Sequence, residues 1–178
     1  MDFQPLFASH IHAGIKTAAR YCNEIAGDHE LPMRQDFRPA RVRPIIGHMF
    51  LLDVLSQGED YRYAICGVNI ARLIGVDGTN MCLSALPQTD MSARLKQTYD
   101  DVVASRSYQY VRGHYVWPDR TIAIERLLVP MTDRDGQLRS ILGVAISDCP
   151  PDMLVIYAGV GLAKLEIDER ITAKNSVQ

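Results

Sequence analysis

Residues 106–147 constrain the fold more than any other part of this sequence. Three strand-like runs follow one another there: Ser107–Val116, Thr121–Met131 and Leu138–Ser147. Trp117–Arg120 places proline at the second position of a tight turn, and Arg134–Gln137 contains the Asp-Gly pair of a β-hairpin. The stretch therefore predicts three consecutive antiparallel strands, each paired with the one before it.

The last two of these strands carry aliphatic side chains on both faces. In the first of them, Ile122, Ile124 and Leu128 alternate with Ala123, Leu127 and Val129. A sheet that is apolar on both faces has to be covered on both faces. Helices from the middle of the chain can cover one face, and the N-terminal helix or a second subunit must cover the other.

The chain before this meander predicts one hairpin and several helices. Its expected elements are strands at Ile45–Leu55 and Tyr61–Cys66, short helices at Val68–Ile74 and Gly78–Leu86, and a longer helix from Thr89 or Asp90 to about Ala104. Gly75 is placed to end the first short helix, and Pro87 the second. The strands and helices are thus mixed along the chain, which indicates an α+β domain.

An apolar stripe runs along the predicted N-terminal helix, His10–Ala26, which Ser9 would cap at one end and Gly27 at the other. Its positions are spaced by four, three, four and three residues: Ile11, Ile15, Ala18, Cys22 and Ile25. So narrow a stripe suits packing on the chain's own domain or pairing with a partner helix. Both alternatives remain open, and under the second these five residues are the candidate dimer contact.

Composition excludes several classes of protein. The 178 residues suit one domain with terminal extensions, and the net charge of −2 gives no reason to expect nucleic acid as a partner. No stretch is long and apolar enough for a membrane span, and the first residues do not look like a secretory signal. Four scattered cysteines without an export signal are expected to be reduced thiols, so we expect a cytoplasmic protein.

The predicted domain organisation has three parts. Residues 1–43 form the N-terminal helix and a linker, residues 44–148 form the domain, and residues 149–178 form a C-terminal extension. Within that extension, Asp152–Ala163 is an apolar segment of mixed character, and Lys164–Gln178 is polar and expected to be a frayed tail.

The order of elements resembles that of a PAS domain, and several segments resemble a bacterial family of stand-alone PAS-like proteins. The similar segments are Leu31–Pro39, His48–Val54, Tyr61–Gly67, Glu125–Met131 and Ile141–Val144. The resemblance covers about residues 9–148. It implies a five-stranded antiparallel sheet of order 2-1-5-4-3, with helices on one face and the N-terminal helix outside the core. It also implies a sensing or protein-interaction module that is commonly dimeric.

Motifs for cofactors or catalysis are not found. Light-sensing PAS domains present Gly-x-Asn-Cys, whereas Gly78–Cys82 places the cysteine one residue out of register. The helix Met91–Ala104 has no histidine for a haem, and no histidine and cysteine cluster has the spacing of metal ligands. Hydrolase and phosphate-loop motifs are missing as well. We therefore expect no cofactor, no metal and no catalytic residue.

Arg126 is the most informative charged residue. It alternates with Ile124 and Leu128, while Glu125 points to the opposite face and cannot pair with it. Arg126 is expected to form an internal ion pair, to reach the rim, or to anchor an anionic ligand inside the domain. Under the last alternative, Tyr99, Tyr110 and Arg112 would line the same pocket.

These observations favour a non-enzymatic sensory module. It would act on an unidentified signalling protein as a homodimer, formed through the N-terminal helix and the outer face of the sheet. The alternative is a receptor for a small molecule, such as an anionic metabolite, bound in the PAS cavity.

Overall fold

The chain folds around one antiparallel sheet. A computed structural model describes residues 1–86, 90–117, 120–148 and 164–172. Its strands lie in the order β2-β1-β5-β4-β3-β6, and every neighbouring pair is antiparallel. Their bounds are β1 Met49–Leu55, β2 Asp60–Cys66, β3 Gln109–Trp117, β4 Arg120–Thr132, β5 Leu138–Ser147 and β6 Lys164–Thr172. The predicted α+β class and the order 2-1-5-4-3 are confirmed, with one strand added.

The meander β3-β4-β5 lies where the sequence predicts it. Gly136, in the turn between β4 and β5, has φ +73°, which explains the Asp-Gly pair there. The proposed turn residues Pro118 and Asp119 lie outside the described residues.

The sixth strand corrects one expectation. The segment from Lys164 was expected to be a frayed tail, but Lys164–Thr172 pairs with β3 from Val116↔Lys164 to Gln109↔Thr172. This pairing satisfies the backbone groups that β3 would otherwise leave open at the edge of the sheet. The neighbouring segment Asp152–Ala163 lies outside the described residues.

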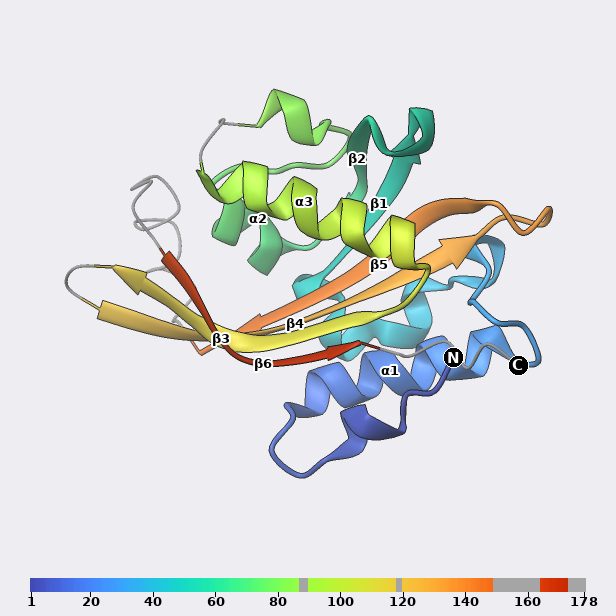
Figure 1. Cartoon of the computed structure of the whole chain (residues 1–178), viewed down its shortest axis with the longest axis horizontal. Coiled ribbons are helices and arrows are strands. Elements are labelled where there is room, and N and C mark those ends of the chain that lie inside the picture. The colour runs from blue at the N-terminus through green and yellow to red at the C-terminus, as the bar shows by residue number, and fades with distance from the viewer. Residues whose placement is uncertain (87–89, 118–119, 149–163, 173–178) are drawn as a thin grey trace.

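Helices cover both faces of the sheet, as Figure 1 shows. Helices α2 (Val68–Ile74) and α3 (Asp90–Ser105) lie on one face, here called the inner face, and α1 (Ala13–Ala26) lies on the other, the outer face. Short 3-10 turns complete the two layers: η1 Gln4–Phe7, η2 Arg34–Asp36, η3 Pro39–His48, η4 Ser56–Gly58 and η5 Leu83–Ala85. The predicted pair of covering layers is therefore present.

Alternation along β1 divides the interior into two hydrophobic cores. Leu51 belongs to the core under α1, and its neighbour Leu52 belongs to the core under α2 and α3. Phe50 shares the inner face with Leu52, and its ring covers Gly143 of β5. A Cβ atom at Gly143 would lie 2.0 Å from Cζ of Phe50, so the ring needs a glycine beneath it.

The apolar stripe of α1 packs on the chain's own sheet. Ile11, Ile15, Ala18 and Cys22 are at most 2% exposed within the outer core, and Ile25 packs against it. In this conformation the five residues proposed as a dimer contact are turned inward. The stripe is thus not available to a partner helix unless α1 leaves the sheet.

Helix α1 starts three residues later than predicted. His12 is its N-cap, and its Nδ1 accepts a hydrogen bond from the Gly14 amide at 2.9 Å. At the other end Gly27 follows the helix with φ +54°, as expected of a C-terminal cap. An imidazole thus takes the place that the sequence assigned to Ser9.

Two further boundaries differ from the prediction. The apolar run from Ile45 begins with 3-10 turns that contain Pro44, and β1 starts only at Met49. The expected short helix Gly78–Leu86 is reduced to the single turn η5, because Cys82 instead forms an antiparallel bridge with Arg62 of β2. Helix α2 has the predicted bounds, and Gly75 ends it with φ +80°.

Candidate functional site

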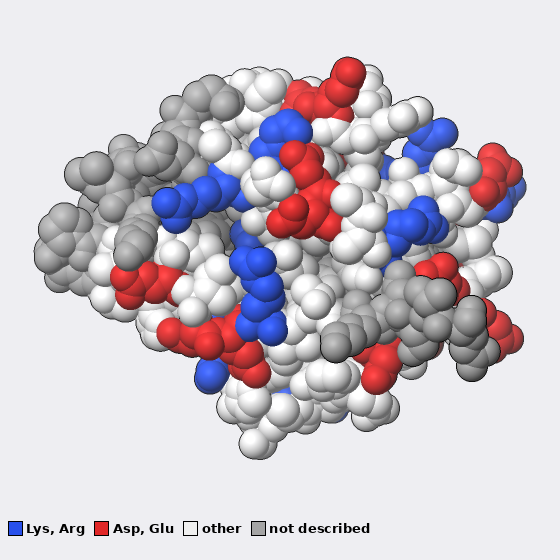
Figure 2. Space-filling view, viewed as in Figure 1, with Lys and Arg blue, Asp and Glu red and all other residues white. Residues whose placement is uncertain are grey.

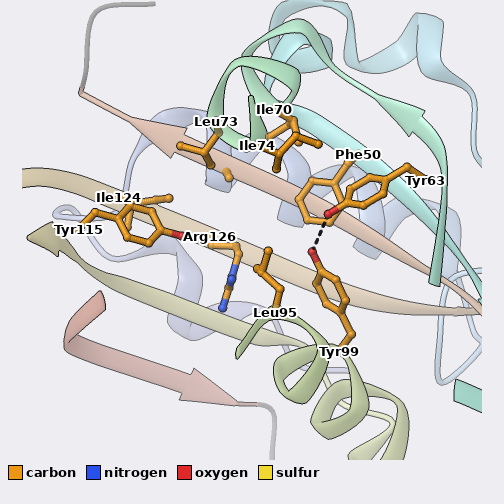
Figure 3. Close-up of a pocket in the computed structure, with 11 residues that line it drawn as sticks. Phe50, Tyr63, Ile70, Leu73, Ile74, Leu95, Tyr99, Tyr115, Ile124 and Arg126 are labelled. Atoms are coloured by element: carbon orange, nitrogen blue, oxygen red, sulfur yellow. Dashed lines mark hydrogen bonds between the residues drawn. The ribbon is translucent and has the colours of Figure 1, made fainter. Parts of the chain in front are cut away.

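A small cavity lies between α2, α3 and the inner face of the sheet (Figure 3). Its volume is about 30 Å³, enough for about two water molecules. The lining comes from two helices and five strands: Phe50, Tyr63, Ile70, Leu73, Ile74, Leu95, Tyr99, Tyr115, Ile124, Arg126 and Ala145. Arg126 is the one residue in this lining that carries a fixed charge.

Register places Arg126 in the middle of the sheet. On β4 it pairs with Ala145 of β5 on one side and with Val111 of β3 on the other. Its residue exposure is 8%, so it does not reach the rim. Ile124 and Leu128 share its face in the inner core, as the alternation predicted.

Arg126 lacks a counter-ion among the residues that the structure describes. No carboxylate of those residues forms an ion pair with it, and its Nε is buried without a hydrogen-bond partner. An uncompensated buried charge costs about 3–5 kcal/mol. Among the described residues the structure shows neither the internal ion pair nor the rim position, and the anion anchor stays a prediction.

Three tyrosines surround the charge without neutralising it. Burial raises the pKa of Tyr63 well above its usual value and the pKa of Tyr99 to about 12, although Arg126 lowers both. Burial also raises the pKa of Tyr115. The hydroxyls of Tyr63 and Tyr99 lie 3.3 Å apart (Figure 3). At neutral pH all three are uncharged, so they offer polar contacts to a ligand but no counter-charge to Arg126.

Two of the four predicted pocket residues lie on the other side of the sheet. Tyr110 pairs with Leu127 and Arg112 with Glu125, and both β4 residues face outward. The Tyr110 hydroxyl donates to Oε2 of Glu125 at 3.1 Å, and Arg112 Nε lies 3.5 Å from Oε2 of Glu169. The structure therefore brings Tyr99 to Arg126 but separates Tyr110 and Arg112 from them.

Sequence reasoning missed Tyr63 and Tyr115 as lining residues. Tyr115 alternates with Tyr110 and so belongs to the opposite face of β3, which a register prediction for β3 and β4 would have revealed. Tyr63 comes from β2, which the strands β1 and β5 separate from β4 in the sheet order. Nothing local in the sequence connects it to Arg126.

The cavity in this conformation has no room for a flavin or a haem, because pockets for ligands of drug size measure about 300–1,000 Å³. In the described part of the chain, no group of three or more His, Cys, Asp or Glu side chains is placed to hold a metal ion. Cys82 is half-buried. Chemically, the site offers one guanidinium and three neutral hydroxyls within an apolar lining.

The face of the molecule shown in Figure 2 is mixed in charge. Figure 2 shows Lys and Arg side chains interspersed with Asp and Glu side chains on the face in view, in keeping with the net charge of −2. Among the described residues, no helix has the length and hydropathy that crossing a membrane requires.

Similar structures have been solved for two bacterial proteins. A VqmA dimer of Vibrio cholerae, in the absence of its target DNA, gives a TM-score of 0.43 at 15% identity over 61% of this chain and 50% of that chain. The PAS domain of Bordetella pertussis BvgS gives 0.37 at 17% identity over 55% and 72%. This chain spans about half the length of that VqmA chain. Likenesses this distant carry no information about what the chain binds.

A comparison with curated proteins finds no match. A family model described as PAS domain, in contrast, matches residues 11–146, well over half of the 178 residues. The matched range runs from the start of the α1 stripe to the end of β5, and its strands have the PAS order. The chain therefore belongs to the PAS domain family and is a sensory or signalling module.

Proposed function

We propose that this PAS module is a receptor for a small anion, which binds in the inner cavity with Arg126 as its anchor. The observation that carries the proposal is the buried guanidinium without a carboxylate among the described residues. Proteins pair buried charges or bind ligands with them, because an unpaired buried charge destabilises the folded state. A carboxylate or another oxyanion would supply the missing charge and accept hydrogen bonds from the guanidinium.

The size of the cavity sets the class of ligand. A volume of about 30 Å³ suits an anion of a few heavy atoms, such as a short carboxylate, nitrate or phosphate. Leu73 and Ile74 of α2 and Leu95 of α3 contribute apolar side chains to the lining from the helical side. A larger metabolite would have to move these helices away from the sheet, and such movement would itself be a signal.

The proposed output is contact with a signalling protein. PAS domains are mainly non-enzymatic sensory modules, and we propose the same for this chain, in the cytoplasm. A homodimer stays a prediction, and it has to use a surface other than the buried stripe of α1. Light scattering at micromolar concentration tests it, and a monomer with and without ligand would exclude the dimer.

Replacing Arg126 with methionine tests the receptor. Without ligand, Arg126→Met should raise the free energy of unfolding by about 1–4 kcal/mol, because an apolar side chain of similar volume replaces an uncompensated charge. The wild-type protein should gain thermal stability with one or more anions from a panel of short carboxylates, nitrate and phosphate, at constant ionic strength. The variant should lose that response.

Arg139→Met provides the matched control, because the side chain of Arg139 is 59% exposed and pairs with Asp133. This variant should keep the wild-type response to every anion. If the panel raises the melting temperatures of the wild type and of Arg126→Met equally, the effect is not due to the cavity and the proposal is wrong. A wild type that responds to no anion of the panel would also overturn it.

A further inference from the structure

A second hollow lies on the outer face of the sheet beyond the N-terminus of α1; Ile124 is the one residue that it shares with the inner cavity among their lining residues. Its volume is about 360 Å³, within the range of ligand pockets. Ala123 and Ile146 give it an apolar surface, and polar groups come from five separate elements: His12, Arg112, His114, Glu125, Asp148 and Asp168. Nothing in the function proposed above uses this site.

Three acceptor atoms in the lining have no hydrogen-bond partner among the described residues. Glu125 is held through Oε2, which accepts from the His12 amide at 2.9 Å and from Tyr110, so its Oε1 is free. Oδ1 of Asp148 accepts a hydrogen bond from the Ala123 amide at 3.0 Å, so Oδ2 is available to a ligand. His114 presents Nδ1 to Asp168 at 2.9 Å. This contact favours the proton on Nδ1 and leaves a lone pair on Nε2.

Donors line the same hollow. Because Nδ1 of His12 accepts a hydrogen bond from the Gly14 amide, the neutral ring carries its proton on Nε2, which has no hydrogen-bond partner among the described residues. Arg112 lies directly opposite Glu125 in the register, yet the two do not pair, since Arg112 leans toward Glu169. Its Nε makes the 3.5 Å ion pair with Glu169 but no hydrogen bond. No residue that the structure describes forms a hydrogen bond with its two Nη groups.

From this arrangement we infer that the outer hollow is a binding site for a free amino acid. The ammonium group would donate its three N–H bonds to Glu125 Oε1, Asp148 Oδ2 and His114 Nε2. The carboxylate would accept from Arg112 and from Nε2 of His12. The apolar surface of Ala123 and Ile146 would contact the side chain.

Both charges of the ligand are needed to satisfy this site. A plain amine would leave the two Nη groups of Arg112 and Nε2 of His12 without acceptors. A plain acid would lie against the carboxylates of Glu125 and Asp148, which have no ion pair among the described residues. A hydrogen bond to a charged group contributes about 1.5–3 kcal/mol, so loss of either end should weaken binding about ten- to a hundredfold.

The test uses the full chain and a mixture of the standard amino acids. Saturation-transfer NMR selects the binders, and calorimetry then compares the tightest binder with its decarboxylated amine and its deaminated acid. The amino acid should bind about ten- to a hundredfold more tightly than either analogue. Asp148→Asn, which keeps an oxygen for the Ala123 amide, and Arg112→Gln should each weaken binding to a similar extent.

Arg139→Gln is the matched control for charge and should leave binding unchanged. Arg126→Met separates the two sites, because it removes the inner anchor and should not alter the affinity for the amino acid. The inference is overturned if no standard amino acid binds at millimolar concentration, or if the amine alone binds as tightly as the amino acid. Asp148 is exposed, so Asp148→Asn still tests the site if Arg112→Gln fails to fold.

Discussion

The two faces of the sheet treat charge in opposite ways, and adjacent residues of β4 illustrate the difference. Glu125 faces outward, where its carboxylate accepts from the backbone of His12 and from Tyr110. Arg126 faces inward, where its guanidinium has no partner among the described residues and three neutral tyrosines lie around it. The outer face thus uses a charge to fix α1 in place, whereas the charge on the inner face is not paired by any residue that the structure describes.

The comparison shows that burial alone does not identify a site. Both faces bury large aromatic side chains, and both cores are continuous with the same strands. What sets the inner face apart is that Arg126 has no ion pair among the described residues, whereas Arg112 on the outer face lies 3.5 Å from Glu169. Four predictions follow the contrast between the faces, from the largest expected effect to the smallest.

Leu51 and Leu52 are neighbours on β1 that point to opposite faces, and both are 0% exposed. Leu51→Ala and Leu52→Ala should each lower the free energy of unfolding by about 2–5 kcal/mol, because each leaves a cavity in a packed core. Urea denaturation followed by circular dichroism and by tyrosine fluorescence should give one coincident transition for both variants. A separate early loss of helix in Leu51→Ala would mean that α1 docks loosely and that the two faces are not one cooperative unit.

Gly143 tests the inner face alone. Gly143→Ala should cost about 1–3 kcal/mol or more, because the added Cβ would collide with the buried ring of Phe50 and force it into the cavity. Gly136→Asn is the control, since no atom lies within 4 Å of a Cβ there and asparagine tolerates the positive φ. In a double-mutant cycle, Phe50→Leu should relieve part of the cost of Gly143→Ala. Strict additivity would show that the ring does not carry the effect.

Removing the hydroxyl group of one buried tyrosine on each face should change the free energy of unfolding differently. Tyr99→Phe, on the inner face, should cost about 0.5–1.5 kcal/mol because it removes the contact with Tyr63. Tyr108→Phe, on the outer face, should be neutral or stabilising. The Tyr108 hydroxyl is buried without a described partner, and the stacking on Phe3 at 4.9 Å survives the change. Equal losses in the two variants, measured by urea denaturation, would contradict this contrast.

Alkaline pH should destabilise both faces. Burial raises the pKa of Tyr99 and of Tyr108 to about 12, from an ordinary value of 10.0. Between these values the unfolded chain releases the proton that the folded protein retains, so stability is full below pH 10 and falls as the pH rises toward 12. Denaturation midpoints at about pH 9 and about pH 11 measure the slope. Tyr99→Phe and Tyr108→Phe should each make it shallower, and an unchanged slope in both would contradict the assignment.

Helices and strands whose bounds are set by neighbouring residues could be predicted from the sequence. The apolar run Leu138–Ser147 has the bounds of β5, and Gly75 ends α2 at the expected residue. The stripe from Ile11 was identified correctly, but its spacing alone left open whether it faces the sheet or a second chain. Only the packing of α1 on the sheet resolves that choice.

Other features depend on contacts between distant residues. Strand β6 exists because β3 offers it an open edge, and its own charged composition points the other way. The sequence places Tyr110 and Arg112 in the same pocket as Arg126, which is wrong. Alternation shows which residues of one strand share a face, but it does not show which face of β3 lies on the same side of the sheet as Arg126 of β4. That Arg126 lacks a partner among the described residues depends on how distant strands and helices come together, and no residue near it in sequence carries that information.

The added strand also changes how this domain can meet its own copies. With β6 in place, β3 has both sides paired, so one exposed border of the sheet is a strand in which five of nine residues are charged. Charged side chains along such a border discourage another sheet from adding to it. Assembly through this border, whether into an extended sheet or into fibrils, is thereby disfavoured, and the helical layers are left as the better surfaces for contact with another molecule.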